Sequence, residues 1–283
     1  MKDILRKIKL FDVIRAILLV FFLGVLLYPT VSDYLGRIHS SKAITSYNDE
    51  VKGIDKATKN KMLKEAQEYN QSLVNTKLYD PFSTTGKPSE EYMNLLNVSS
   101  DGMMAYLQIP KIDVKLPIYH TTSEEVLSKA AGHLEGSSLP VGGKDTHAVI
   151  SAHRGLPSAT LFTDLDQVKK GDHFLVHVLN KTLCYEVDSI VETEPDDTSA
   201  LAVQEGKDLV SLLTCTPYGV NTQRLIVTGH RVSYNKSVVN KENKNGFTSL
   251  HTNYLLWVIV GLSVTGGFIF ILYKKDKKMR SKE

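Results

Sequence analysis

Two long uncharged segments, one near each end of the chain, constrain the fold most strongly, because each is long enough to enter or cross a membrane. Tyr254–Tyr273 is a run of 20 residues without a charge, enough helix to cross roughly 30 Å of hydrocarbon. Trp257 near one end and Tyr273 at the other suit the two membrane interfaces. Ala16–Ser32 has 17 uncharged residues and is marginal for a full span. It fits a signal peptide, a membrane span or a buried core helix.

Basic residues flank both segments and predict their orientation. They are Lys2, Arg6, Lys7, Lys9 and Arg15 before the first run, and Lys274, Lys275, Lys277, Lys278 and Arg280 after the second. Positive flanks stay in the cytoplasm, so we expect both termini there and residues 36–251 outside. We favour an uncleaved first anchor, because the nearest small-residue cleavage pattern, Ser41-Lys42-Ala43, lies too far downstream; cleavage is the second interpretation. A nucleic-acid partner is disfavoured, since the basic excess lies at the ends and not on the folded body.

The region between the two segments changes from helical to strand-like patterns. Residues 42–76 are polar with apolar positions at helical spacing and predict an amphipathic helix or helix pair, and residues 78–97 predict a loop before a short helix. Short runs rich in β-branched and aromatic residues predict strands at 105–109, 114–119, 147–152, 174–179, 183–191, 209–214 and 225–229. Short helices are predicted at 123–131 and 160–168. Many short strands with few helices indicate a mainly β fold, a closed or nearly closed barrel.

These patterns predict six parts along the chain. They are a cytoplasmic N-terminus with the first anchor or signal sequence (1–35), a helical extension with a loop (36–103), a β-barrel (104–235), a polar linker (236–252), a second transmembrane helix (253–273) and a basic tail (274–283).

The chain has two cysteines, Cys184 and Cys215, both in the external part. A secreted domain of this size buries its own core without a disulfide, although one bridge between them stays possible. Cys215 ends an apolar strand and precedes the turn Thr216–Gly219, which holds a thiol rigidly yet accessibly, as a nucleophile requires. The alternative is a buried structural thiol, which is commoner for a cysteine taken alone.

Two further residues suit the chemistry of a thiol. If residues 216–223 form a hairpin loop, Arg224 lies opposite Cys215 on an antiparallel neighbour. A guanidinium there favours thiolate and can hold an oxyanion or a substrate carbonyl. His153 follows an apolar strand just before a turn, as Cys215 does, and imidazole supplies acid and base steps. The ordinary alternatives are a surface charge for Arg224 and a loop position for His153, one of nine histidines.

These residues resemble the motifs of the sortase family. Leu213-Thr214-Cys215-Thr216 is similar to the signature in which a Thr precedes the nucleophile, Ala152-His153-Arg154-Gly155 to the histidine strand, and Arg224 to the family arginine. The similarity covers roughly Met104 to Val232. It implies an eight-stranded barrel that cleaves a Leu-Pro-x-Thr-Gly sorting signal: Cys215 attacks the Thr carbonyl, His153 protonates the leaving amine, and an amine resolves the thioacyl enzyme. Thr214 and Thr216, which flank the nucleophile, are predicted to bind substrate.

The features outside the barrel resemble class C, the pilin-polymerising sortases. Those enzymes carry a lid with an Asp-Pro-aromatic motif, and Asp80-Pro81-Phe82 lies in the corresponding loop. By resemblance Asp80 pairs with Arg224 and Phe82 covers Cys215; the alternative is that Asp-Pro simply begins a turn. The implied partners are pilin or surface proteins with an LPxTG-like signal, the lysine amine of a pilin, and the lipid bilayer.

Several other functions stay open at this point. The chain also fits a housekeeping sortase that attaches proteins to peptidoglycan, a hydrolytic cysteine protease, or a non-catalytic membrane-anchored ectodomain with a Cys184–Cys215 disulfide. We predict no cofactor and no metal, because the acidic stretch between Glu192 and Glu205 lacks regular oxygen-ligand spacing and is expected to be a solvated loop.

Overall fold

The computed structural model describes residues 10–73, 78–83, 86–99, 101–235, 259, 261–263 and 266–267. Residues 33–247 belong to one compact unit, and residues 1–32 and 248–283 to another. The first predicted anchor lies within helix α2 (Leu10–Gly53), which among the described residues is the one helix long and apolar enough to cross a membrane. Of the second predicted span, the six described residues are helical. The rest of that span, the linker after residue 235 and the basic tail lie outside the described residues.

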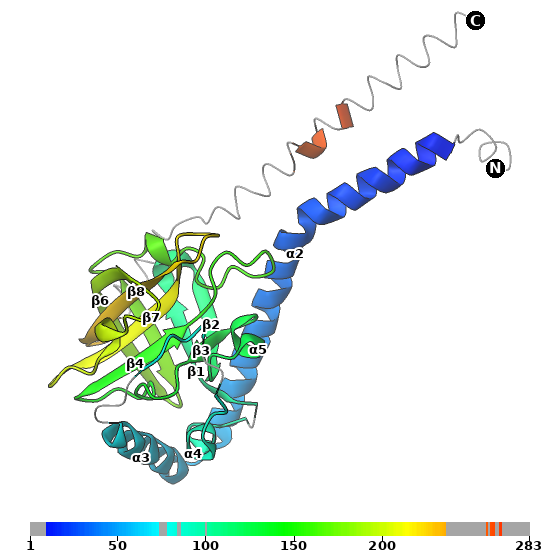
Figure 1. Ribbon diagram of the computed structural model, residues 1–283. Coiled ribbons are helices and arrows are strands. Elements are labelled where there is room, and N and C mark those ends of the chain that lie inside the picture. Colours follow the sequence, from blue (N-terminus) through cyan, green and yellow to red (C-terminus); the bar gives the residue numbers. More distant parts are fainter. Residues whose placement is uncertain are drawn as a thin grey trace, which may run out of the picture. The chain divides into compact units, whose positions relative to one another are not determined.

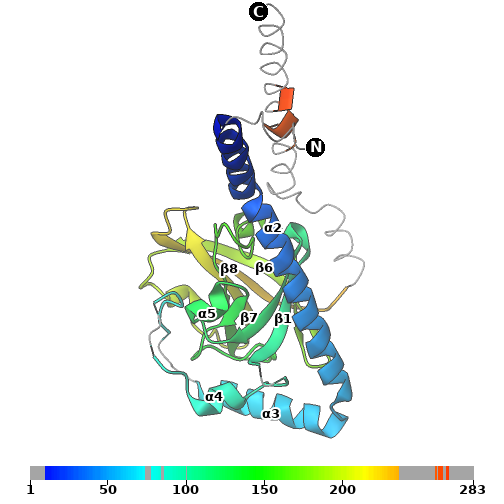
Figure 2. The ribbon, with the colours of Figure 1, turned by 90° about the vertical axis from the view of Figure 1, so that its right-hand side faces the viewer.

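The C-terminal half of α2 packs along the barrel, where Figure 2 shows it beside β1. Tyr47 is fully buried there. Its hydroxyl donates to the carbonyl of Met104 (3.0 Å) and accepts from the amide of Leu179 (2.8 Å). Nearer the middle of the helix, Asp33 accepts from the amide of Thr160 at 2.7 Å. These bonds satisfy backbone groups of the barrel with side chains of the helix.

Two shorter helices complete the extension, as the sequence predicted for residues 42–97. Helix α3 (Lys56–Ser72) begins after the N-cap Asp55, and α4 (Glu90–Asn94) after the N-cap Ser89. Both lie at one end of the barrel (Figure 1). The buried Asn70 ties α3 to the barrel, donating to the carbonyl of Leu139 (3.1 Å) and accepting from its amide (2.7 Å).

Eight strands close into a barrel, which confirms the predicted mainly β fold. They are β1 (Met103–Ile109), β2 (Val114–His120), β3 (Ala131–His133), β4 (Thr146–Ser151), β5 (His173–Val178), β6 (Lys181–Thr193), β7 (Asp208–Thr216) and β8 (Gln223–Val232). Their order is β1-β2-β3-β4-β7-β8-β6-β5. The pairs β2–β3 and β4–β7 are parallel, and the others are antiparallel.

Two local predictions differ from the structure. The helix predicted at 123–131 is the shorter α5 (Glu124–Leu127), because the chain turns into β3 at Ala131. The helix predicted at 160–168 is wrong: this segment forms turns and the 3₁₀ helix η2 (Leu165–Gln167). Its polar groups bond to the loop after β4, where the amide of Phe162 donates to His153 O and Thr163 Oγ1 accepts from Gly155 N. Two more 3₁₀ turns, η1 (Pro110–Ile112) and η3 (Ser199–Leu201), lie in other connections.

The strands β4, β7 and β8 are apolar on both faces. Their inward residues join the large barrel core. Outward residues of these strands, Val149, Leu213 and Ile226, form a second cluster with Leu134 and Leu201 from neighbouring connections; these five residues are here called the outer cluster. A strand with both faces covered is hydrophobic throughout, which explains the continuous apolar runs in this part of the sequence. Leu78 and Phe82 pack on the outer cluster.

Candidate active site

Strand register brings the three sequence-predicted catalytic residues together. In the parallel β4–β7 pair, Ser151 lies beside Leu213, so His153 and Cys215, each two residues further on, reach the same end of the barrel. In the antiparallel β7–β8 pair, Cys215 lies directly opposite Arg224. The predicted hairpin geometry for Arg224 is therefore observed.

Two of these residues, Cys215 and Arg224, continue the line of the outer cluster. Residues two apart along a strand share a face, so Cys215 follows Leu213 and Arg224 precedes Ile226 on the outer side of the barrel. Cys215 is 8% exposed and Arg224 9%. The arrangement is an apolar floor that ends in a thiol and a guanidinium.

The loop at residues 78–83 lies over this site. Arg224 and Asp80 form a bidentate ion pair, with Nε to Oδ1 at 2.8 Å and Nη2 to Oδ2 at 2.7 Å. Both side chains are about one-tenth exposed. The ring of Phe82 lies 5.1 Å from Cζ of Arg224 and 5.4 Å from the ring of His153. The Asp-Pro-Phe segment therefore occupies the space in front of the candidate catalytic residues.

Hydrogen bonds also hold the described part of this loop. The amide and hydroxyl of Ser83 donate to the carbonyl of Asp80, which closes a local turn. Thr198 Oγ1 donates to the carbonyl of Leu78 at 3.2 Å. The turn interpretation of Asp-Pro and the pairing with Arg224 thus hold together, and the bidentate, charge-assisted ion pair ties the loop to the barrel.

The site with the loop in place disfavours the Cys215 thiolate. Burial raises the pKa of the Cys215 thiol above its ordinary value; the Arg224 guanidinium works against this rise, and the Asp80 carboxylate adds to it. The bond to Asp80 raises the pKa of Arg224 in turn. Burial is therefore the main cause of the raised pKa of the Cys215 thiol, and the Arg224 charge offsets only part of it.

Two residues near His153 were not assigned a role from the sequence. Glu124, the first residue of α5, places Oε2 3.1 Å from Nε2 of His153. The buried Arg154 guanidinium donates to Asp166, to the carbonyl of Thr163 and to Thr216 Oγ1. Neither role has a sequence signal, because Glu124 is one of several acidic residues at a helix start and the partners of Arg154 are distant in sequence.

The two predicted substrate-binding threonines are engaged inside the protein. Thr214 is fully buried and donates to the carbonyl of Ala152 at 2.8 Å, which ties β7 to the end of β4. Thr216 Oγ1 accepts from Arg154 (3.3 Å) and donates to Glu192 (3.4 Å). Their roles in substrate binding stay predictions.

No disulfide joins Cys184 and Cys215. Cys184 lies in β6 beside Leu175 and Val232, in a small cluster of its own. Cys184 pairs with Val232 at the far end of β8, whereas Cys215 pairs with Arg224 near its start. The scaffold alternative, which required this bridge, is contradicted.

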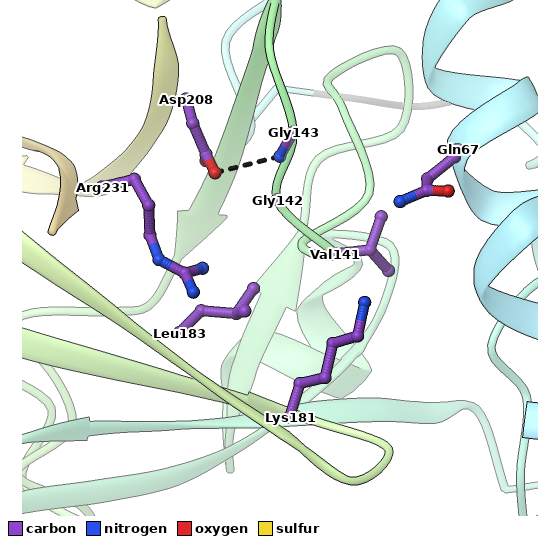
Figure 3. Close-up of a pocket in the computed structure, with 8 residues that line it drawn as sticks. All are labelled: Gln67, Val141, Gly142, Gly143, Lys181, Leu183, Asp208 and Arg231. Atoms are coloured by element: carbon purple, nitrogen blue, oxygen red, sulfur yellow. Dashed lines mark hydrogen bonds between the residues drawn. The ribbon is translucent and has the colours of Figure 1, made fainter. Parts of the chain in front are cut away.

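A cavity of about 430 Å³ lies at the other end of the strands, and Figure 3 shows the residues that line it. It is lined by Asp208, which begins β7, and by Arg231, near the end of β8. Asp208 Oδ2 accepts from the amide of Gly143, and Oδ1 from the Tyr185 hydroxyl. Because Cys215 and Arg224 lie at the opposite ends of the same two strands, this cavity does not contain the candidate chemistry.

Comparison with known proteins gives concordant matches. The family model for the sortase domain matches residues 107–232. Sortase D of Bacillus subtilis (strain 168) is 32% identical over 130 residues, which cover 45% of this chain and 63% of that protein, slightly under two thirds of its length. A solved sortase C of Streptococcus pneumoniae is 46% identical with a TM-score of 0.63, over 68% of this chain and 97% of that one. Sortase C1 of Streptococcus agalactiae is 42% identical with a TM-score of 0.65, over 71% and 99%.

Proposed function

This chain belongs to the sortase family, and we propose that it is a membrane-anchored cysteine transpeptidase of class C that joins pilin subunits. One observation carries the proposal: Cys215, His153 and Arg224 meet on three neighbouring strands beneath a loop latched to Arg224 by Asp80. The solved relatives that share this fold at 42–46% identity are C-type sortases. The pneumococcal one is described together with its pilin substrate specificity.

The proposed first step cleaves the sorting signal. The Cys215 thiolate attacks the carbonyl carbon of Thr in a Leu-Pro-x-Thr-Gly-like sequence, and Arg224 stabilises the oxyanion. The Thr–Gly bond breaks, His153 gives its proton to the leaving amine, and a thioester remains on Cys215. The apolar floor of the outer cluster supports the extended apolar part of the signal.

The proposed second step transfers the acyl group. The lysine amine of a second pilin attacks the thioester carbonyl, His153 takes the proton from the attacking nitrogen, and the C–S bond breaks to regenerate the thiolate. No oxidant, reductant or cofactor enters either step. Water or a cell-wall amine as acceptor corresponds to the hydrolytic and housekeeping alternatives.

We place the barrel outside the cell, with residues 16–32 of α2 as one anchor and residues 253–273 as the second. The apolar character of α2 and the basic residues at both ends support this topology. Two anchors would confine the enzyme to the membrane from which its substrates emerge and raise their effective concentration.

The loop at residues 78–83 is proposed to act as an autoinhibitory lid. The support is its position: Asp80 neutralises Arg224, and Phe82 lies against both Arg224 and His153. A substrate must therefore displace the loop before the thiol reacts.

Intact-mass spectrometry tests the chemistry. The full chain in detergent is incubated with a Leu-Pro-x-Thr-Gly peptide, with or without a lysine-bearing acceptor peptide. We expect a thioacyl adduct on Cys215 that is absent in Cys215→Ala, that increases in the double variant Asp80→Ala/Phe82→Ala, and that the acceptor discharges. An adduct discharged by water alone would support the hydrolase, and the lack of adduct in every variant would refute the transpeptidase.

A further inference from the structure

We propose that Glu124 is a positioning residue that orients His153 for proton transfer, an inference that rests on the function proposed above. Its carboxylate Oε2 lies 3.1 Å from Nε2 of His153. The histidine side chain is 20% exposed and the glutamate side chain 78%, so the pair lies at the outer edge of the site.

The protein holds the two partners on one rigid frame. Helix α5 is fixed by the buried Leu127, which packs where Gly132 of β3 leaves space: a Cβ there would lie 3.1 Å from Leu127 Cδ2 and 2.3 Å from the carbonyl oxygen of Thr121. Strand β3 in turn pairs with β4 through Gly132 and Ser151. His153 follows β4 directly, so its backbone and that of Glu124 are both tied to the β3–β4 pair.

The bond determines which ring nitrogen does the chemistry. An ionised carboxylate only accepts hydrogen bonds. Nε2 of His153 therefore carries a hydrogen and donates it in the hydrogen bond to Glu124. This leaves Nδ1 for the proton transfers at Cys215 and at the amines. A carboxylate in this place fixes the tautomer and ring orientation and stabilises the imidazolium that forms during each step.

The contact gains importance when the loop leaves. In the closed arrangement Phe82 packs against the His153 ring and helps to hold it. Phe82 belongs to the loop and departs with it, whereas Glu124 belongs to the barrel and stays. Of the neighbouring charges, Arg154 is paired with Asp166, and Arg224 loses Asp80 when the loop leaves. A guanidinium only donates hydrogen bonds, so neither arginine can replace the carboxylate. Glu124 therefore orients His153 in the open, working state.

The next residue in the chain offers a matched control. Glu125 is also in the first turn of α5 and is 88% exposed, and it pairs with Lys129 at 3.7 Å, away from His153. Glu125→Gln removes the same charge from the same helix turn, so any general effect of charge or helix stability appears in this variant as well.

The experiment compares Glu124→Gln, Glu124→Ala and Glu125→Gln in the full-length protein, each with the native loop and with Phe82→Ala. Rates of thioacyl formation with the sorting peptide give kcat and KM between pH 5.5 and 9, and iodoacetamide alkylation of Cys215 is followed over the same range. For Glu124→Ala we expect kcat to fall about 10-fold with KM unchanged, and for Glu124→Gln, which keeps an acceptor, about 3-fold. The loss should be larger with Phe82→Ala, which removes the other contact to the His153 ring.

Each contrary outcome has one meaning. Equal kinetics and pH profiles for Glu124→Ala and Glu125→Gln would overturn the positioning role. A defect confined to the acceptor step would also overturn it, because Glu124 would then contact the incoming amine instead. If the wild type forms no thioacyl adduct, the proposed function fails, and the alkylation profile, which needs no substrate, still decides whether Glu124 acts on the Cys215–His153 pair.

Discussion

Replacing Asp80 by asparagine should open the loop over Cys215, because one bidentate ion pair supplies its strongest attachment. Asparagine keeps one acceptor oxygen for Arg224 but presents an NH₂ group to the other guanidinium N–H. The variant loses a charge-assisted hydrogen bond at a pair that is only about one-tenth exposed. Such a bond contributes about 2–3 kcal/mol, and each 1.4 kcal/mol is tenfold. The open-to-closed ratio should rise roughly 30- to 150-fold.

Alkylation of Cys215 by iodoacetamide measures this ratio directly. While the closed form dominates, the rate is proportional to the open fraction, so it should rise by the same factor until the open form becomes the major one. The pH dependence should change too. Both the burial and the Asp80 charge raise the pKa of the Cys215 thiol, and the substitution removes the charge and reduces the burial. The pKa should fall, so the variant keeps reacting at pH values where the wild type has become slow.

Asp49→Asn is the matched control. It removes a carboxylate from α2 that pairs with Lys52 at 2.8 Å, with both side chains largely exposed, and such pairs contribute little. We expect its alkylation rate to stay within about twofold of the wild type. An Asp80→Asn rate equal to that of Asp49→Asn would refute the view that the ion pair keeps the loop closed.

Three further predictions concern the framework around the site. Gly132→Ala places a Cβ 2.3 Å from the carbonyl oxygen of Thr121, which should cost about 3 kcal/mol and lower the melting temperature by about 10 °C; an unchanged melting curve would contradict it. Asn70→Ala leaves the amide and carbonyl of Leu139 without their side-chain partner, and about 2–3 kcal/mol should be lost in urea unfolding. Burial lowers the pKa of His133 to about 4, whereas the pKa of a histidine in the unfolded chain is about 6.5. The free energy of unfolding should therefore decline by about 3 kcal/mol as the pH falls from 6.5 to 4. In His133→Asn the melting temperature should change less with pH across this range.

Local sequence patterns are sufficient to predict the barrel and the meeting of the three catalytic candidates. Seven strands were predicted from short β-branched runs, and all are present. The distance from Cys215 to Arg224 fitted a hairpin, and the register Cys215–Arg224 is observed. This success has a physical reason: the side-chain period of a strand is two, so register alone fixes which residues face each other.

Features that depend on tertiary contacts were missed. Strand β3 has three residues, too few to show alternation, and it exists because Gly132 pairs between β2 and β4. The predicted helix at 160–168 is absent because the amide of Phe162 donates to the carbonyl of His153 and the amides of Thr163 and Leu165 close local turns. Glu124 and Arg154 act on partners 29 and 62 positions away. No local pattern encodes such pairs.

The catalytic candidates and the loop that covers them are held in place by different interactions. His153, Cys215 and Arg224 are placed by strand pairing, which is cooperative with the whole barrel and changes only when the barrel unfolds. The contacts of the loop that covers them include one ion pair, a hydrogen bond to Thr198 and the packing of Leu78 and Phe82, and none of these belongs to the strand pairing. Opening therefore requires only a small part of the total stability. Substitutions in the loop should increase access to Cys215, and their loss of stability cannot exceed the free energy of loop opening. Substitutions such as Gly132→Ala should lower the melting temperature and leave access to Cys215 unchanged.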